Sequence, residues 1–175
     1  STLMHRAPPH PVPRSETDLM NADSYAADRR EIAHIVTRLY ASVSSPAGVE
    51  PPIDREKELL HPRARKCRTL RDEAGRAHFQ IIPGESYADD VRRLVTEIGF
   101  FEVEMAHQCF VYGHVAQVVS HYEAYADEAR TRRLKKGVNL IQLLKVEGEW
   151  KVFSMIWDDE ENRVLSSPEA GGRSS

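Results

Sequence analysis

His107 is the side chain of this sequence that is best suited to acid–base chemistry. It lies between Met105 and Cys109 on the apolar face of an expected strand. Because burial disfavours the imidazolium ion, a histidine there would be neutral near pH 7 and could act as a general base. The alternative is a core histidine hydrogen-bonded to a neighbour such as Ser120 or Tyr122, since buried polar groups are rarely unpaired.

Asp158 is the second candidate acid or base. It follows Trp157 at the end of an expected strand, and a carboxylate beside an aromatic ring at a pocket mouth would have a raised pKa. Asp158 also begins the acidic run DDEE, which is typical of a solvated strand end. Both interpretations remain open from the sequence.

Several polar side chains could orient a ligand beside these two groups. Tyr122 and Ser120 share the predicted face of His107, and Tyr40 lies on the inner face of a predicted helix. Asn139 is a candidate pocket amide or a dimer contact. For each tyrosine the alternative is a packing role with a paired hydroxyl. The candidate ligand-binding residues are therefore Tyr40, Ser120, Tyr122, Asn139 and Trp157.

The sequence indicates no metal and no cofactor. Glu104 would face His121 across the first hairpin, which could form a metal site or an outward polar ladder, and we predict no metal. No Gly-rich phosphate loop, nucleophile elbow or CxxC pair is present. Cys67 and Cys109 lie in strand-like sequence, where we expect reduced, buried thiols.

The N-terminal half must supply the elements that cover a sheet. Apolar residues at helical spacing predict an amphipathic helix from about residue 24 to 43, and a short helix is expected over 54–61. Residues 64–72 and 75–83 resemble a hairpin with its turn near 73–75, or two short edge strands. A third helix is predicted from Ser86 to Ile98, ended by Gly99.

Residues 100–158 predict four long strands in sequence. If Tyr112 and Gly113 form the first turn, Val111 faces His114, and this hairpin has one apolar and one polar face. With Glu147 and Gly148 at the second turn, the second hairpin is apolar on both faces. Its predicted faces are Asn139, Ile141, Leu143, Val152, Ser154 and Ile156 on one side, and Val138, Leu140, Gln142, Leu144, Phe153, Met155 and Trp157 on the other.

An antiparallel sheet usually leaves one face in water, and three short helices cover only one side. We therefore predict a homodimer that packs sheet against sheet about a two-fold axis.

Length and composition bound the remaining possibilities. The chain of 175 residues, 41% hydrophobic, fits one domain at 23–160, with an extended or disordered tail at 1–22 and a flexible tail at 161–175. The net charge of −3 and the lack of a basic stripe argue against nucleic acid as a partner. No apolar run approaches 18 residues and no signal peptide is evident, so we expect no membrane partner and a cytoplasmic protein.

Three segments resemble the NTF2-like superfamily, with its SnoaL-like and ketosteroid-isomerase-like branches. ELLHPRA (58–64) resembles a helix-end segment of the type LFHPDA, and GHVAQVVSHYEAY (113–125) resembles the pattern G-x-x-A-x-V-x-S-x-Y-E. The most specific piece is residues 135–160, which resembles the closing hairpin RG-x-N-x-x-Q-L-x-x-x-x-G-x-W-x-I, with Lys136 in place of the arginine. The resemblance covers about residues 24–160.

The resemblance implies an α+β fold of the cystatin-like or NTF2-like type. In this fold a curved antiparallel sheet wraps around an N-terminal helix, with two further short helices, and forms a cone with an apolar pocket. Such proteins are often dimers, and they include isomerases, dehydratases, cyclases and non-catalytic assembly modules. The fold alone does not choose among these functions. We expect a dimeric domain that binds a small apolar ligand; the alternatives are an acid–base enzyme using His107 or Asp158, and a non-catalytic interaction module.

Overall fold

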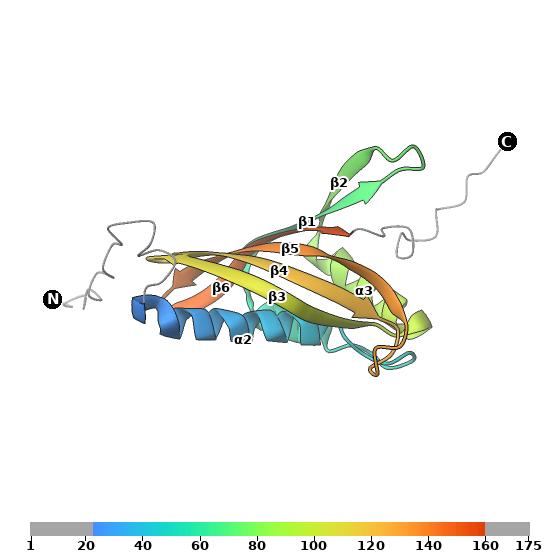
Figure 1. The fold of residues 1–175 in the computed structure, drawn as a ribbon, viewed down its shortest axis with the longest axis horizontal. Helices are drawn as coiled ribbons and strands as arrows, with labels where there is room; N and C mark the ends of the chain where they lie inside the picture. The colour runs from blue at the N-terminus through green and yellow to red at the C-terminus, as the bar shows by residue number, and fades with distance from the viewer. Residues whose placement is uncertain (1–22, 160–175) are drawn as a thin grey trace.

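A six-stranded curved sheet wraps around one long helix, as Figure 1 shows. This computed structural model describes residues 23–159, so the two predicted tails lie outside the described residues. The elements, in chain order, are η1 (Asp23–Tyr25), α2 (Ala26–Ser42), η2 (Ile53–Glu58), β1 (Leu60–Arg71), β2 (Ala77–Ile82), α3 (Gly84–Ile98), β3 (Phe101–Tyr112), β4 (Val115–Tyr125), β5 (Arg133–Val146) and β6 (Glu149–Asp159).

Helix α2 forms where the apolar period predicts it, and its apolar stripe is buried against the sheet. Ile32, Val36 and Leu39 pack in the main core cluster together with Ile141 and Trp150. This contact buries the face that recurs at helical spacing, which supplies most of the stability of such a helix. The short helix expected over 54–61 is a 3₁₀ helix that ends at Glu58, and residues 60–62 already belong to β1.

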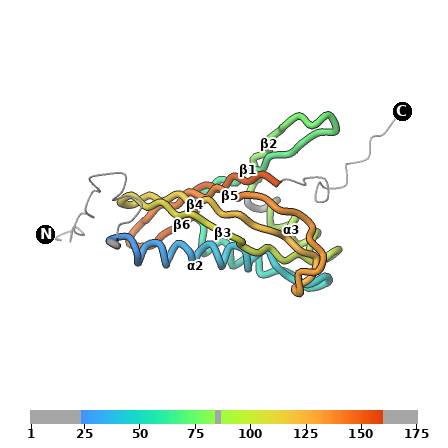
Figure 2. The backbone as a smooth tube through the Cα atoms, viewed as in Figure 1, coloured from blue at the N-terminus to red at the C-terminus, as the bar shows by residue number. Residues whose placement is uncertain are grey.

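The four C-terminal strands form the predicted meander, and the smooth trace in Figure 2 follows them from one edge of the sheet inward. The strand order is β2-β1-β6-β5-β4-β3. Every neighbouring pair is antiparallel except β1 and β6, which run parallel. The β1–β2 hairpin extends beyond the body of the sheet (Figure 1).

The two hairpin turns test the predicted registers. Glu147 and Gly148 form the second turn as expected, and their φ angles of 52° and 83° fit a two-residue turn that matches the strand twist. The first turn lies one residue later than predicted, because Tyr112 pairs with Val115 and Gly113 is inside the turn. This shift changes the partners of each residue but not the face on which it lies.

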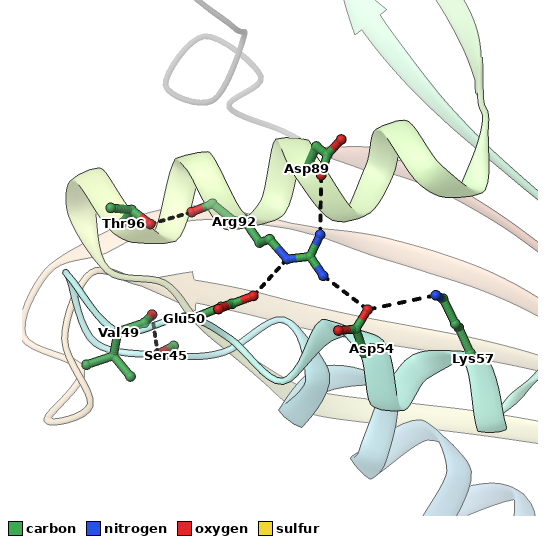
Figure 3. Close-up of polar contacts among 8 residues, drawn as sticks. All are labelled: Ser45, Val49, Glu50, Asp54, Lys57, Asp89, Arg92 and Thr96. Carbon is green, nitrogen blue, oxygen red and sulfur yellow. Dashed lines mark hydrogen bonds and ion pairs between the residues drawn. The ribbon is translucent and has the colours of Figure 1, made fainter.

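Helix α3 closes the wide end of the cone. Its apolar residues face the sheet as predicted, with Val95 fully buried. Gly99 ends the helix with a φ of 67°, and a Cβ atom there would lie 2.7 Å from the carbonyl oxygen of Ala126. On the opposite face, Arg92 donates hydrogen bonds to Glu50 at 2.9 Å and Asp54 at 3.0 Å, which attaches α3 to the segment around η2 (Figure 3).

The cysteines and the possible metal ligands of residues 23–159 are dispersed. Within this range, no three His, Cys, Asp or Glu side chains gather closely enough to hold a metal ion. Cys67 and Cys109 are free and half-buried, on β1 and β3. None of the helices in the same range is both long enough and apolar enough to cross a membrane.

Candidate functional site

A cavity of about 250 Å³ lies between α3 and the inner face of the sheet. Helix α3 supplies an apolar wall through Tyr87, Val91, Leu94 and Ile98. Asp90, Arg93 and Glu97 of the same helix also line the cavity. The sheet supplies further polar groups, because its inner positions at this end, on β1 and on β3 to β6, carry charged, hydroxyl and amide side chains. These sheet residues are Arg68, Glu102, Tyr122, Lys135, Asn139, Trp157 and Asp159, with Phe100 and Met155 beside them.

Lys135, Tyr122 and Asp159 form a buried cluster at the cavity wall. Lys135 Nζ donates to Asp159 Oδ2 at 3.1 Å, and the Tyr122 hydroxyl donates to Asp159 Oδ1. All three residues are at most 8% exposed. Gly137 makes this arrangement possible, since a Cβ atom at position 137 would lie 2.8 Å from the Tyr122 hydroxyl and 3.0 Å from Asp159 Oδ1.

Burial shifts the pKa values of Asp159 and Lys135 in the directions that favour their neutral forms. Desolvation raises the pKa of Asp159 to about 7, and the nearby Glu102 carboxylate adds to this rise. Desolvation lowers the pKa of Lys135 to about 8, although the charge of Glu102 opposes the change. Removal from water favours the neutral form of each group. Both groups can therefore exchange protons close to neutral pH.

Glu102 is the second carboxylate of the cavity. Its Oε1 accepts one long hydrogen bond, at 3.5 Å, from Asn139 Nδ2. Desolvation raises the pKa of Glu102, with Lys135 and Lys66 opposing the rise. The cavity therefore presents two carboxylates and one amine of perturbed proton affinity, a pattern that is typical of functional sites.

A hydrogen-bonded chain runs from the cavity toward the edge of the sheet. Asn139 Nδ2 donates to the Tyr40 hydroxyl at 3.1 Å, and Tyr40 lies 2.6 Å from Ser120 Oγ. Ser120 donates to Glu104, whose other oxygen lies 2.7 Å from His107 Nδ1. Ser120 and Tyr40 are buried, and burial raises the pKa of the Tyr40 hydroxyl well above its usual range. These groups therefore hold Asn139 in place from behind the cavity.

A second buried ion pair supports the start of α3. Lys66 Nζ lies 2.5 Å from Glu56 Oε1 and 3.6 Å from the centre of the Tyr87 ring. Tyr87 also meets Trp157 edge to face, with ring centres 6.1 Å apart. Burial lowers the pKa of Lys66, while the charge of Glu56 opposes that change. These contacts fix two aromatic rings of the cavity wall.

The predicted site residues separate into three positions. Tyr122, Asn139 and Trp157 line the cavity, whereas Tyr40 and Ser120 lie directly behind it. His107 shares a face with Ser120, as predicted, and its ring contacts Glu104. Asp158 lies on the outer face, exposed, where it accepts a hydrogen bond from Thr69 at 2.6 Å and lies 3.7 Å from Arg71.

A bulge in β3 explains why sequence reasoning misses Glu102 and Glu104. Glu104 pairs with Tyr122 and Ala106 with His121, so Met105 has no partner in the ladder. One extra residue reverses the faces on one side of a bulge. The prediction that Glu104 faces His121 on the outer surface is therefore wrong, and both glutamates point inward.

A second bulge, at Phe153 in β6, corrects the prediction for the other hairpin. Gln142 pairs with Ser154 but Leu143 pairs with Val152, so Phe153 has no partner in the β5–β6 ladder. Beyond this point Trp157 shares the face of Asn139, and Asp159 rather than Asp158 points into the cone. The sequence does hold a signal for this bulge, because the inner apolar residues Val152 and Met155 are three residues apart instead of two.

Comparisons with known proteins bear on the fold. No family model and no curated protein matches the sequence. Among solved structures, a Nostoc punctiforme protein of unknown function with a cystatin-like fold matches with a TM-score of 0.58 at 11% identity, over 77% of this chain and 92% of that chain. An NTF2-like protein with a cystatin-like fold from Novosphingobium aromaticivorans matches with a TM-score of 0.58 at 14% identity, over 88% of this chain and 98% of that chain.

This chain has the NTF2-like fold. The association domain of CaMKII from C. elegans shares the architecture, with a TM-score of 0.53 at 14% identity over 77% of this chain and 98% of that chain. Identities this low establish the fold alone, and one NTF2-like scaffold carries many functions. The fold therefore leaves the function to the residues that line the cavity and the outer face of the sheet.

Proposed function

We propose that this chain is a ligand-binding NTF2-like domain, whose cavity between α3 and the sheet holds a small organic molecule. The observation that carries the proposal is the cavity itself: it has an apolar wall formed by Tyr87, Leu94 and Trp157 and a polar end formed by Lys135 and Asp159. Apolar pockets with a few convergent polar groups are the usual form of small-molecule sites.

A cavity-filling substitution tests this function. Leu94→Trp adds bulk to the cavity wall, and we expect it to abolish binding of any small molecule that native mass spectrometry finds carried through purification. Thr96→Trp adds the same side chain to the exposed face of the same helix and is the matched control. Retained binding in a folded Leu94→Trp variant would contradict the proposal.

The outer face of the sheet supports self-association. Leu140 and Ile156 are direct partners across β5 and β6 and are 43% and 47% exposed, and Phe153 and Phe110 lie on the same surface. An apolar groove of about 500 Å³ lies beside them. Contiguous apolar patches of this kind mark interfaces. We infer that two copies pack through this face, and the likeness to an association domain agrees with this role.

Light scattering tests the dimer. Leu140→Glu places a charge in the proposed interface, so we expect the measured mass to fall from two chains to one. Val49→Glu changes an equally exposed apolar residue in the loop before η2 and should leave the mass unchanged. A wild-type protein that is monomeric at micromolar concentration would refute this part of the proposal.

A second function, acid–base catalysis, is favoured by the raised pKa of Asp159 beside the Tyr122 hydroxyl. A general base works best when its pKa lies near the working pH. We propose Asp159 as the base and Tyr122 as the hydrogen-bond donor. His107 and Asp158 remain the alternatives predicted from the sequence.

A generic proton-abstraction probe separates these candidates. Ring opening of a nitrobenzisoxazole needs one base that removes a carbon-bound proton while the N–O bond breaks. We expect the wild-type rate to rise with pH through about 7 and to be lost in Asp159→Asn. Loss in His107→Ala or Asp158→Asn instead would assign the base to that residue.

A further inference from the structure

Lys135 differs from a purely structural lysine because it is buried and also lines the cavity. Its side chain is 10% exposed, lines the cavity and lies on the inner face of β5. Its Nζ lies 5.8 Å from the ring centres of both Phe100 and Tyr122. By contrast, Lys66, the other buried lysine at this end, lies against Glu56 and the Tyr87 ring and does not line the cavity.

The surroundings of Lys135 favour a neutral amine. Desolvation lowers its pKa to about 8, Arg68 on β1 lowers it further, and Glu102 on β3 opposes both. Roughly one tenth of the side chains would then be uncharged at pH 7, compared with about one in three thousand for a free lysine. Asp159 on β6, the carboxylate nearest to the amine, accepts its proton across a 3.1 Å hydrogen bond.

We propose that Lys135 is a nucleophile that captures a ligand bearing an aldehyde or ketone carbonyl as an imine within the cavity. The proposal rests on the proposed function, because it requires that the cavity admits a small organic molecule. It adds the chemical class of that ligand and a covalent step. A desolvated lysine beside a proton-transferring group is the general arrangement for imine chemistry.

The chemistry balances with the groups present. The neutral Nζ attacks the carbonyl carbon, a C–N bond forms, and the carbonyl oxygen takes a proton to give a carbinolamine. Asp159 in its protonated form is the donor, and the Tyr122 hydroxyl holds its other oxygen. Nitrogen then loses a proton to Asp159, which passes it to the hydroxyl group, so that water leaves as the C=N bond forms. The resulting iminium ion returns its N–H proton to Asp159. The net reaction is amine plus carbonyl giving imine plus water, with no oxidant or reductant.

Reductive trapping tests the imine. The full chain is incubated with benzaldehyde and sodium cyanoborohydride, which reduces an imine to a stable secondary amine. Intact mass spectrometry and peptide mapping then locate the added benzyl group. We expect one early addition, on Lys135, at least tenfold faster than on any other lysine, with a rate that is greatest between about pH 7 and about pH 8, because the step needs both the neutral amine and the protonated Asp159.

Matched variants make the result specific. Lys135→Arg keeps the charge but cannot form an imine, so the early addition should disappear. Lys136→Arg changes the next residue, whose side chain points to the opposite face of β5, and should leave the addition unchanged. Asp159→Asn should slow the addition at Lys135 at least tenfold, because the amine loses its proton acceptor. If Lys135→Arg fails to fold, peptide mapping of the wild type still decides the question.

Benzyl alcohol separates this proposal from the one on which it rests. It has nearly the same shape as benzaldehyde and no carbonyl group. Competition by benzyl alcohol against trapping at Lys135 would support both the cavity and the imine. Binding of benzyl alcohol in the cavity with no preferred trapping of Lys135 would overturn the imine alone. Trapping spread evenly over the surface lysines would also overturn it.

Discussion

Gly137 of β5 lies directly opposite Asp159 of β6, and there is no room for a methyl group between them. A Cβ atom at position 137 would lie 2.4 Å from the carbonyl oxygen of Asp158 and 2.8 Å from the Tyr122 hydroxyl. Backbone cannot move aside without breaking the β5–β6 ladder. This contact gives a physical reason for the glycine in the segment KKGVN, two residues before the cavity amide Asn139.

Gly137→Ala should therefore destabilise the fold and disturb the cavity. Overpacking of this kind typically costs about 1–3 kcal/mol of unfolding free energy. We also expect weaker binding in the cavity, since Tyr122 and Asp159 must separate. Urea denaturation and ligand titration measure the two effects.

Gly75→Ala is an informative comparison for this variant. Gly75 lies in the turn between β1 and β2 with a φ of 77°, and a Cβ atom added there would meet nothing within 4 Å. Gly75→Ala should lower the free energy of unfolding by about 1–2 kcal/mol through the backbone conformation alone. Cavity binding should be unaffected. Equal loss of binding in both variants would mean that binding follows general stability and not the Gly137 contact.

The raised pKa of Asp159 predicts a specific pH dependence of stability. The folded protein holds this proton up to a pH of about 7, whereas the unfolded chain loses it near the ordinary aspartate pKa of 3.8. The contribution of Asp159 to stability is therefore full below pH 3.8 and is lost as the pH rises through 7. Asp159→Asn cannot ionise, so the difference in unfolding free energy between wild type and variant should fall by about 4 kcal/mol across this window, because the pKa shift of about three units is worth about 1.4 kcal/mol per unit.

Two observations check the sign of this prediction. Asp158→Asn removes a neighbouring charge on the exposed outer face and should give a much smaller slope. A wild-type advantage that grows with pH would mean that Lys135 holds Asp159 ionised in the folded state. That outcome would refute both the raised pKa and the role of Asp159 as a proton donor.

The sequence predicts the elements of this fold better than the geometry of its site. Helical and strand periods identify α2, α3 and the meander, because those patterns depend on which face is buried. The bulges at Met105 and Phe153 each insert one residue, and the alternation of side chains then reverses along the strand. For this reason simple alternation places Glu102, Glu104 and Asp159 on the wrong face, while it places Tyr122 and Asn139 on the regular strands correctly.

Ser120→Ala tests the hydrogen-bonded chain behind the cavity. Ser120 is fully buried and connects Tyr40 to Glu104, so its loss leaves both groups short of one partner. Unsatisfied buried polar groups cost about 1–3 kcal/mol each. We expect a loss of stability in this range by thermal or urea denaturation, together with weaker cavity binding because Asn139 loses its support.

His107→Ala is the control for Ser120→Ala. His107 is bound to the outer end of the same chain, and its side chain is 28% exposed, so water can replace its contact with Glu104. Its effect on stability should be clearly smaller than that of Ser120→Ala. Loss of cavity binding in His107→Ala without loss of stability would restore His107 as a functional residue.

Arg92 helps to hold α3 closed over the cavity. Its guanidinium group bonds Glu50 and Asp54 outside the helix and Asp89 at 3.2 Å within it (Figure 3). The helix supplies the apolar wall of the cavity, so its opening is the simplest entry route for a ligand. Arg92→Ala should increase hydrogen exchange in α3 severalfold and speed both ligand entry and ligand release, because opening of α3 then breaks fewer contacts.

Lys57→Ala removes a partner of the same Asp54, at 3.9 Å, without touching α3, and should change neither rate. Equal exchange in the two variants would mean that the apolar contacts of Val91, Leu94 and Val95 alone hold the helix closed.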